Sequence, residues 1–120
     1  PYNVVKMSKE PVAPTFLHKP ILRQEDDGNR LVFECELIAN PRPMVTESNT
    51  WVQWFRNEHE VLDTQRTEYK ILEKAPGKYY IALAIDDVYE PDKGLYTVFA
   101  KNHLGDVSSS INLNFLRKYS

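Results

Sequence analysis

The segment LVFECEL, residues 31–37, decides the fold of this chain because it carries an apolar side chain at every second position. Side chains of a β-strand point alternately to its two faces, so one face of this segment is apolar and the other holds two glutamates. A strand with one apolar face has to be covered by a second layer. The segment also contains Cys35, the one cysteine of the chain.

Similar short alternating segments recur along the chain, separated by turn residues such as those at 26–29 (DDGN) and 75–77 (APG). Glycine and asparagine accept the positive φ angles that such turns need. No segment has a convincing helical period. The pattern predicts an all-β fold, a two-sheet antiparallel sandwich. Strands are expected at residues 14–17, 21–22, 31–38, 51–56, 61–62, 68–72, 79–85, 95–101 and 107–115.

Length, charge and cysteine content limit the class of protein. The chain has 120 residues and a formal net charge of -2, with 15 basic and 17 acidic residues. This balance argues against a nucleic-acid surface or a polybasic membrane anchor. We expect a single domain at residues 13–116, with linkers at 1–12 and 117–120, in a longer protein. A lone thiol favours a reducing, cytoplasmic compartment; the alternative is a secreted domain that lost a disulfide.

Six motifs follow one another in a fixed order. They are Cys35 in its strand, NPRP at 40–43, WFRN at 54–57, LAIDDV at 83–88, DKGLY at 92–96 and AKNHLG at 100–105. Together they resemble an immunoglobulin domain of the intermediate (I-set) type, and most closely those of giant muscle proteins such as titin and twitchin. The resemblance covers about residues 13–116.

The resemblance implies a framework of seven residues: Cys35, Trp54, Leu83, Asp92, Gly94, Tyr96 and Val98. In that fold a second cysteine lies two residues after the tyrosine, and here Val98 holds the position. Cys35 is expected to face it without an intradomain disulfide. Trp54 is expected to lie in the centre of the sandwich, and the Tyr96 hydroxyl to bond backbone a few residues upstream. Gly94 and Gly105 are expected to need positive φ.

The chain departs from the family pattern between its second and third strands. Residues 44–53 intervene before the core tryptophan, and we interpret them as a longer loop. Loops on rigid sandwiches are common recognition sites, so it is a candidate protein-binding loop. Its candidate residues are Met44, Glu47, Asn49 and Trp51. Two alternatives remain open: the loop covers the domain's own end, or Trp51 rather than Trp54 is the core tryptophan.

No catalytic constellation is recognisable in the sequence, and we expect neither a cofactor nor a metal. The three histidines are scattered over expected loops and strand ends: His18, His59 and His103. A buried Cys35 is expected to be inert. A further candidate protein-binding surface is an exposed sheet face and its edges. The alternative is a solvated charged face without a binding role. The residues of this surface are Lys70, Glu73, Lys74, Lys101 and Asn112.

The resemblance implies a non-enzymatic structural and protein-interaction module of an intracellular sarcomeric scaffold, one link of a tandem array. Expected partners are neighbouring immunoglobulin and fibronectin-type domains, actin, myosin or other scaffold proteins. Neither nucleic acid, membrane nor a small-molecule substrate is expected. The alternatives are an extracellular adhesion or receptor domain, and a docking or regulatory domain beside a protein kinase.

Overall fold

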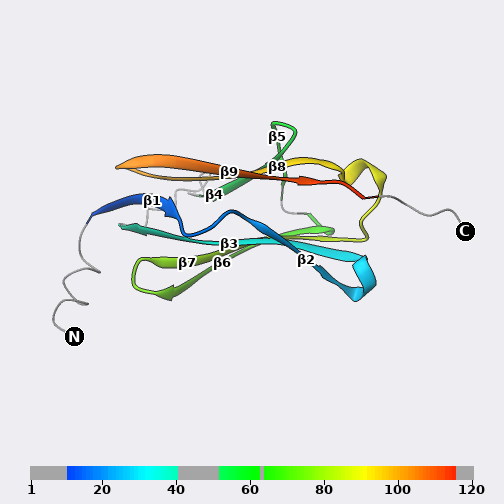
Figure 1. The fold of residues 1–120 in the computed structure, drawn as a ribbon, viewed down its shortest axis with the longest axis horizontal. Helices are drawn as coiled ribbons and strands as arrows, with labels where there is room; N and C mark the ends of the chain where they lie inside the picture. Colours follow the sequence, from blue (N-terminus) through cyan, green and yellow to red (C-terminus); the bar gives the residue numbers. More distant parts are fainter. Residues whose placement is uncertain (1–10, 41–51, 63, 116–120) are drawn as a thin grey trace, which may run out of the picture.

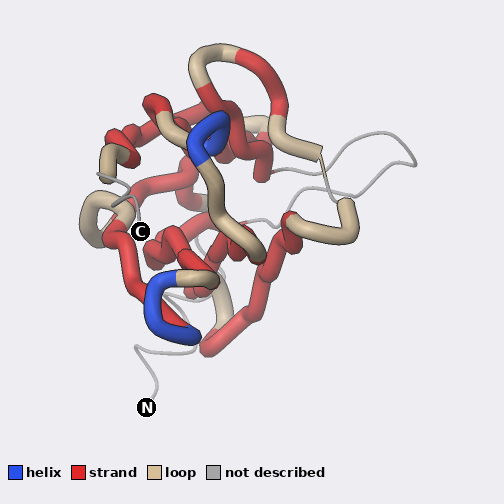
Figure 2. Tube along the Cα trace, turned by 90° about the vertical axis from the view of Figure 1, so that its right-hand side faces the viewer, coloured by secondary structure: helices blue, strands red, loops and turns tan. Residues whose placement is uncertain are grey.

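The computed structural model describes residues 11–40, 52–62 and 64–115, which form nine strands and two single-turn 3-10 helices (Figure 1). The strands are β1 (Val12–Phe16), β2 (Ile21–Glu25), β3 (Arg30–Asn40), β4 (Val52–Arg56), β5 (His59–Glu60), β6 (Thr67–Ala75), β7 (Lys78–Asp86), β8 (Gly94–Asn102) and β9 (Gly105–Leu113). The short helices are η1 (Asp26–Gly28) and η2 (Glu90–Asp92). Both lie at the same end of the molecule, the end nearest the viewer in Figure 2.

The strands form two antiparallel sheets that lie one above the other in Figure 1. In the larger sheet β3 pairs with β7 and β7 with β6, while β1 and β2 both pair with the other side of β3. The smaller sheet has the order β5-β4-β8-β9. The all-β two-sheet sandwich expected from the sequence is therefore confirmed.

The core lies between the sheets and is built from alternate residues of each long strand. Phe33, Cys35 and Leu37 of β3 face inward, as their spacing predicted, and all are essentially inaccessible to solvent. The Phe33 ring stacks on Tyr96 with centroids 4.4 Å apart and lies 6.1 Å from Trp54. Aromatic side chains of this size bury roughly 150–250 Å² each, so this group dominates the apolar contribution to stability.

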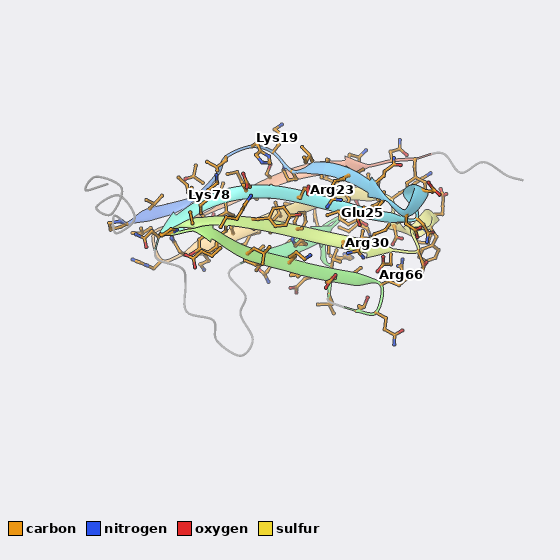
Figure 3. The ribbon with its side chains drawn as sticks, turned by 90° about the horizontal axis from the view of Figure 1, so that it is seen from below. Lys19, Arg23, Glu25, Arg30, Arg66 and Lys78 are labelled. Atoms are coloured by element: carbon orange, nitrogen blue, oxygen red, sulfur yellow. The ribbon has the colours of Figure 1, made fainter. Side chains whose placement is uncertain are left out.

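A second apolar group lies on the outer face of the larger sheet. Val32, Ala82 and Ala84 are at most 6% exposed there, and the partly buried Tyr80 packs against them. Figure 3 shows Arg23, Glu25 and Arg30 side by side on this face. Ion pairs connect it across β2, β3, β7 and β6: Arg23–Glu34 at 3.2 Å, Arg30–Glu25 at 3.0 Å, Arg30–Asp86 at 2.8 Å and Arg30–Glu68 at 3.5 Å.

The strand between β4 and β6 differs from the sequence expectation. It lies at His59–Glu60, not at residues 61–62, because Asn57 and Glu58 form a two-residue turn. Their φ angles are 48° and 73°, the left-handed region that hairpin turns of this length use. The turn places Arg56 opposite His59. Asparagine tolerates this conformation, which is the signal that sequence reasoning missed.

The expectation of a positive φ at Gly105 is wrong. The glycines with positive φ are Gly28, Gly77 and Gly94. Gly105 instead begins β9 opposite Asn102, and residues 103–104 make the connection between the two strands. The turn is completed before Gly105, so its backbone has the ordinary extended conformation of a strand.

Candidate functional site

The centre of the sandwich holds Trp54, Cys35 and Val98, none more than 1% exposed. Trp54 of β4 lies opposite Val98 of β8, and Cys35 comes from β3 in the other sheet. All three belong to one core cluster. The Trp54 indole Nε1 is buried with no hydrogen-bond partner among the described residues. The position that the alternative assigned to Trp51 is therefore occupied by Trp54.

Cys35 is a free, buried cysteine, so the described sandwich has no disulfide. Burial, with a smaller contribution from the charge of Glu36, raises the pKa of the thiol to about 12. The thiolate is the nucleophilic and metal-binding form of cysteine, and almost none of it exists near neutral pH at such a pKa. Cys35 is a packing residue, and Leu83, which is 0% exposed on β7, has the same role.

Tyr96 connects β8 to the loop before it. Its hydroxyl donates a hydrogen bond of 2.6 Å to the backbone oxygen of Asp92, four residues upstream. This is the geometry of a tyrosine corner. The ring is 1% exposed, and burial raises the pKa of the phenol. The bond fixes the path of the chain from η2 into β8.

The Asp92 carboxylate is 3% exposed and accepts hydrogen bonds from the Arg66 guanidinium and from a backbone amide. Arg66 Nη1 donates to Oδ2 at 3.1 Å and Nη2 to Oδ1 at 3.2 Å, and the Tyr89 amide donates to Oδ2 at 3.0 Å. The Arg66 guanidinium also lies 4.7 Å from the centroid of the Tyr89 ring. Hydrogen bonding to Asp92 raises the pKa of Arg66. A bidentate arginine–carboxylate pair combines strength with fixed geometry.

Arg66 was missed by sequence reasoning, which assigned Asp92 to the framework without its partner. Arg66 precedes β6 by one residue and is 26 residues from Asp92, so no local motif joins them. It also donates to the backbone oxygen of Asp86 at 3.0 Å, which ties β7 to the start of β6. The pair thus connects three segments at the end of the sandwich.

The other candidate residues do not gather into one site. Lys70, Glu73 and Lys74 lie on β6 of the larger sheet, whereas Lys101 and Asn112 lie on the smaller one. All five are exposed. His18, His59 and His103 are exposed as well, and no three His, Cys, Asp or Glu side chains of the described residues form a metal-binding group. No helix among the described residues is long and apolar enough to cross a bilayer.

The candidate binding loop falls mostly outside the described residues. Met44, Glu47, Asn49 and Trp51 all belong to the part of the chain that is not described. The last two residues of the predicted loop are described: Val52 is buried at the start of β4, and Gln53 follows it in the same strand. The loop prediction therefore remains a prediction.

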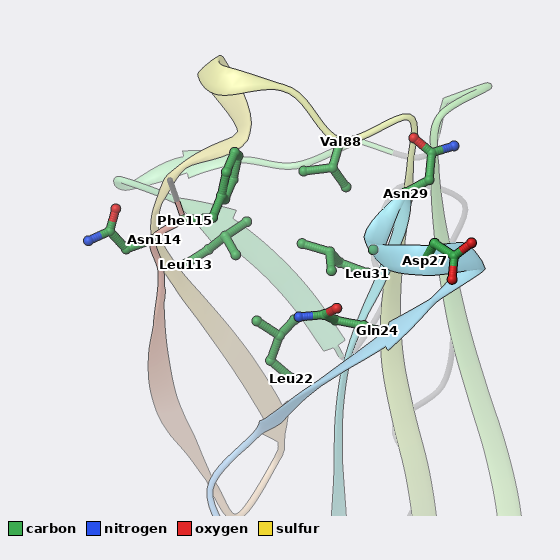
Figure 4. Close-up of a pocket in the computed structure, with 10 residues that line it drawn as sticks. Leu22, Gln24, Asp27, Asn29, Leu31, Val88, Leu113, Asn114 and Phe115 are labelled. Atoms are coloured by element: carbon green, nitrogen blue, oxygen red, sulfur yellow. The ribbon is translucent and has the colours of Figure 1, made fainter. Parts of the chain in front are cut away.

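A pocket of about 400 Å³ opens between β2 and the end of β9 (Figure 4). Leu22 and Leu31 line it from one sheet, and Leu113 and Phe115 from the end of the other. Figure 4 shows Gln24, Asn29 and Asn114 around this apolar surface. The pocket marks the side of the sandwich where β2 and β9 do not pair.

The architecture, the tyrosine corner and the buried tryptophan define an immunoglobulin-like sandwich. Residues 14–115 match the model of the immunoglobulin I-set domain family. The chain belongs to this family, whose fold is generally non-catalytic.

The relatives of the chain include muscle proteins. It is 31% identical over 104 residues to titin of Drosophila melanogaster, covering 87% of this chain and a rounded 0% of that protein. It is 28% identical over 102 residues to human myotilin, covering 85% of this chain and 18% of that protein. The chain therefore spans only a small part of these curated relatives.

Solved structures show the same sandwich. The titin M4 structure superposes with a TM-score of 0.70 at 19% identity, covering 90% of this chain and 100% of that one. The twitchin kinase region from C. elegans superposes with a TM-score of 0.64 at 28% identity. That match covers 85% of this chain and 16% of that one.

Proposed function

We propose that this chain is a non-catalytic structural and protein-interaction module of a large intracellular muscle scaffold, where it forms one link of a tandem array. One observation carries the proposal: a complete I-set core in which Cys35 is a buried free thiol and Val98 replaces its bridging partner. Such a core needs no oxidising compartment. Similarity to titin and myotilin supports the muscle assignment.

The geometry suits a link in an array because the described chain enters at one end and leaves at the other (Figure 1). At the first end Asn102 Nδ2 donates to the Val12 backbone oxygen at 2.9 Å. At the second end, Gly94 lies opposite Leu113 and the Lys93 ammonium lies 5.0 Å from the centroid of the Phe115 ring. Neighbouring domains at the two ends would be held a full strand length apart.

The proposed partners are actin, myosin or other sarcomeric scaffold proteins, and residues 44–53 are the proposed contact. Co-sedimentation of the folded protein with actin filaments and with myosin filaments, at two salt concentrations, tests both points. A deletion of residues 44–50 and the intact chain are compared side by side. Binding that disappears with the deletion supports the loop, and binding that persists moves the contact to the sheets.

Absence of binding to either filament by the intact, folded protein would contradict the filament-binding part of the proposal. Location is tested separately, by expressing a fluorescent fusion of the chain in muscle cells. A striated pattern in register with the sarcomere is expected. A secreted or surface-bound product would favour the extracellular alternative.

The second candidate function is docking or regulation beside a protein kinase. The observation that favours it is the 28% identity to a segment of the twitchin kinase region. Sequencing the full transcript distinguishes the two. A kinase domain encoded next to this chain would support the second candidate, and a series of further immunoglobulin domains would support the first.

A further inference from the structure

β9 is the outermost strand of the smaller sheet, and among the described residues β8 is its one strand partner. β1 lies beside the β8–β9 hairpin, where a side chain on Gly105 would come within 3.6 Å of the Ala13 Cβ. Beyond that point both β1 and β2 pair with β3 of the other sheet. Among the described residues no strand therefore pairs with the outer side of residues 108–113.

The register of the hairpin shows which backbone groups face outward. Asn102 lies opposite Gly105 across a two-residue connection, and such a closing pair exchanges hydrogen bonds within the hairpin. Bonding then alternates along an antiparallel pair, so every second residue of β9 turns its N–H and C=O away from β8. These residues are Asp106, Ser108, Ser110 and Asn112.

Two of the edge strands of the sandwich, β6 and β9, differ in how they resist pairing with another chain. β6, at the edge of the larger sheet, carries Glu68, Lys70, Glu73 and Lys74 among nine residues. Residues 107–113 of β9, VSSSINL, carry neither a charge nor a proline. Charges and prolines are the usual protection of an exposed edge, so β6 is protected and β9 is not.

The inward side chains of β9 are incompletely covered. Val107 and Ile111 pack against the core but remain half-buried, whereas Leu113 is 2% exposed. A further strand beside β9 would place its own inward side chains next to these two residues. The edge therefore offers apolar contacts as well as backbone hydrogen bonds.

We propose that β9 is a homodimerisation edge, at which the β9 strands of two copies pair antiparallel around a two-fold axis and join the smaller sheets. The segment is self-complementary. When two copies of β9 pair around a two-fold axis that passes through one residue position, each even-numbered residue lies opposite an even-numbered residue of the other copy. The backbone groups that point away from β8 in the two copies therefore meet. Within residues 108–112 serine, asparagine and isoleucine then oppose one another, without like charges. The proposal does not depend on filament binding.

Variants that place charges on the exposed side chains of Ser108, Ser110 and Asn112 test this pairing. One variant carries Ser108→Lys, Ser110→Lys and Asn112→Lys, and a second carries glutamate at the same positions. Sedimentation equilibrium over a concentration series should show dimers for the wild type and for an equimolar mixture of the two variants. Each variant alone should dimerise at least about tenfold more weakly, because like charges oppose one another.

A matched control carries Glu68→Lys and Leu72→Lys on the exposed β6 edge, which adds the same three positive charges, and it should dimerise like the wild type. Monomeric wild type up to its solubility limit would overturn the proposal. So would undiminished dimerisation of the lysine variant, since the interface would then lie elsewhere. If the variants fail to fold, backbone amide hydrogen exchange of wild-type Ser108, Ser110 and Asn112 tests the proposal instead. Exchange that slows with increasing protein concentration is expected. Exchange that does not depend on protein concentration would overturn the proposal.

Discussion

The side-chain amide of Asn57 occupies the space that a Cβ on Gly94 would need. A Cβ built there would lie 2.6 Å from Asn57 Nδ2 and 2.8 Å from Oδ1. The same amide oxygen accepts a hydrogen bond of 2.9 Å from the Leu95 backbone N–H. Asn57 and Gly94 both have positive φ, 48° and 147°. The conformation of the turn after β4 and that of the start of β8 therefore depend on each other.

Gly94→Ala is expected to destabilise the fold by about 1–3 kcal/mol, through backbone strain and displacement of Asn57. Gly105→Ala is the matched control. Its φ is not in the left-handed region, and its added Cβ would meet the Ala13 Cβ at an ordinary 3.6 Å. Urea unfolding of the two variants measures the difference. Equal costs at the two positions would show that the Asn57 contact is unimportant.

Tyr96→Phe removes the hydroxyl that donates to the Asp92 backbone oxygen but keeps the ring stacked on Phe33. Because the acceptor is left buried without this donor, we expect a loss of about 1–3 kcal/mol in the free energy of unfolding. Tyr80→Phe is the control, since its hydroxyl donates to the Glu34 carboxylate at 3.0 Å on the outer sheet face. That variant should lose less than about 1 kcal/mol. A larger loss for Tyr80→Phe would contradict the assignment of the corner.

Arg66 and Asp92 should be strongly coupled. Removing Arg66 leaves the Asp92 carboxylate, which is 3% exposed, without its bidentate bond, so Arg66→Met alone is expected to cost about 3 kcal/mol. Arg66→Met followed by Asp92→Asn should cost much less than the sum of the two single changes. A double-mutant cycle from urea unfolding gives the coupling. Additive costs would show that the pair contributes little.

The buried Cys35 thiol predicts a specific pH dependence. Its pKa is about 12 when folded against an ordinary 9.0, so the unfolded chain loses this proton first. The thiol's contribution to the free energy of unfolding is therefore fully present below pH 9. It declines as the pH rises toward 12, by up to about 1.4 kcal/mol per pH unit. Cys35→Ala should lack this slope, while buried tyrosines such as Tyr96 titrate in both proteins. Comparing the two between pH 8 and about 10.5 isolates the thiol.

The same burial predicts slow chemical modification. A thiol reagent added at neutral pH should react with the native protein at the rate of unfolding, and at once in strong denaturant. Rapid modification of the folded protein would place Cys35 outside the core.

Sequence reasoning found the parts of the fold that periodicity and side-chain size control. The inward faces of β3 and β7 follow from alternation, and the bulk of Trp54 favours the centre of the sandwich. The parts it missed depend on long-range geometry. Nothing local places Arg66 beside Asp92, or Asn57 over Gly94, and no pattern shows that β2 stays with β3 and leaves the outer side of β9 without a strand partner among the described residues.

Urea unfolding of the purified chain in excess reductant is the measurement that most directly tests whether packing alone holds this I-set core together. We expect one cooperative transition, with a free energy of unfolding of about 5–10 kcal/mol. At protein concentrations where the chain is monomeric, this free energy should be the same with and without the reductant. A broad, non-cooperative transition, or a sandwich that forms only under oxidising conditions, would contradict a core that is held together by packing without a disulfide.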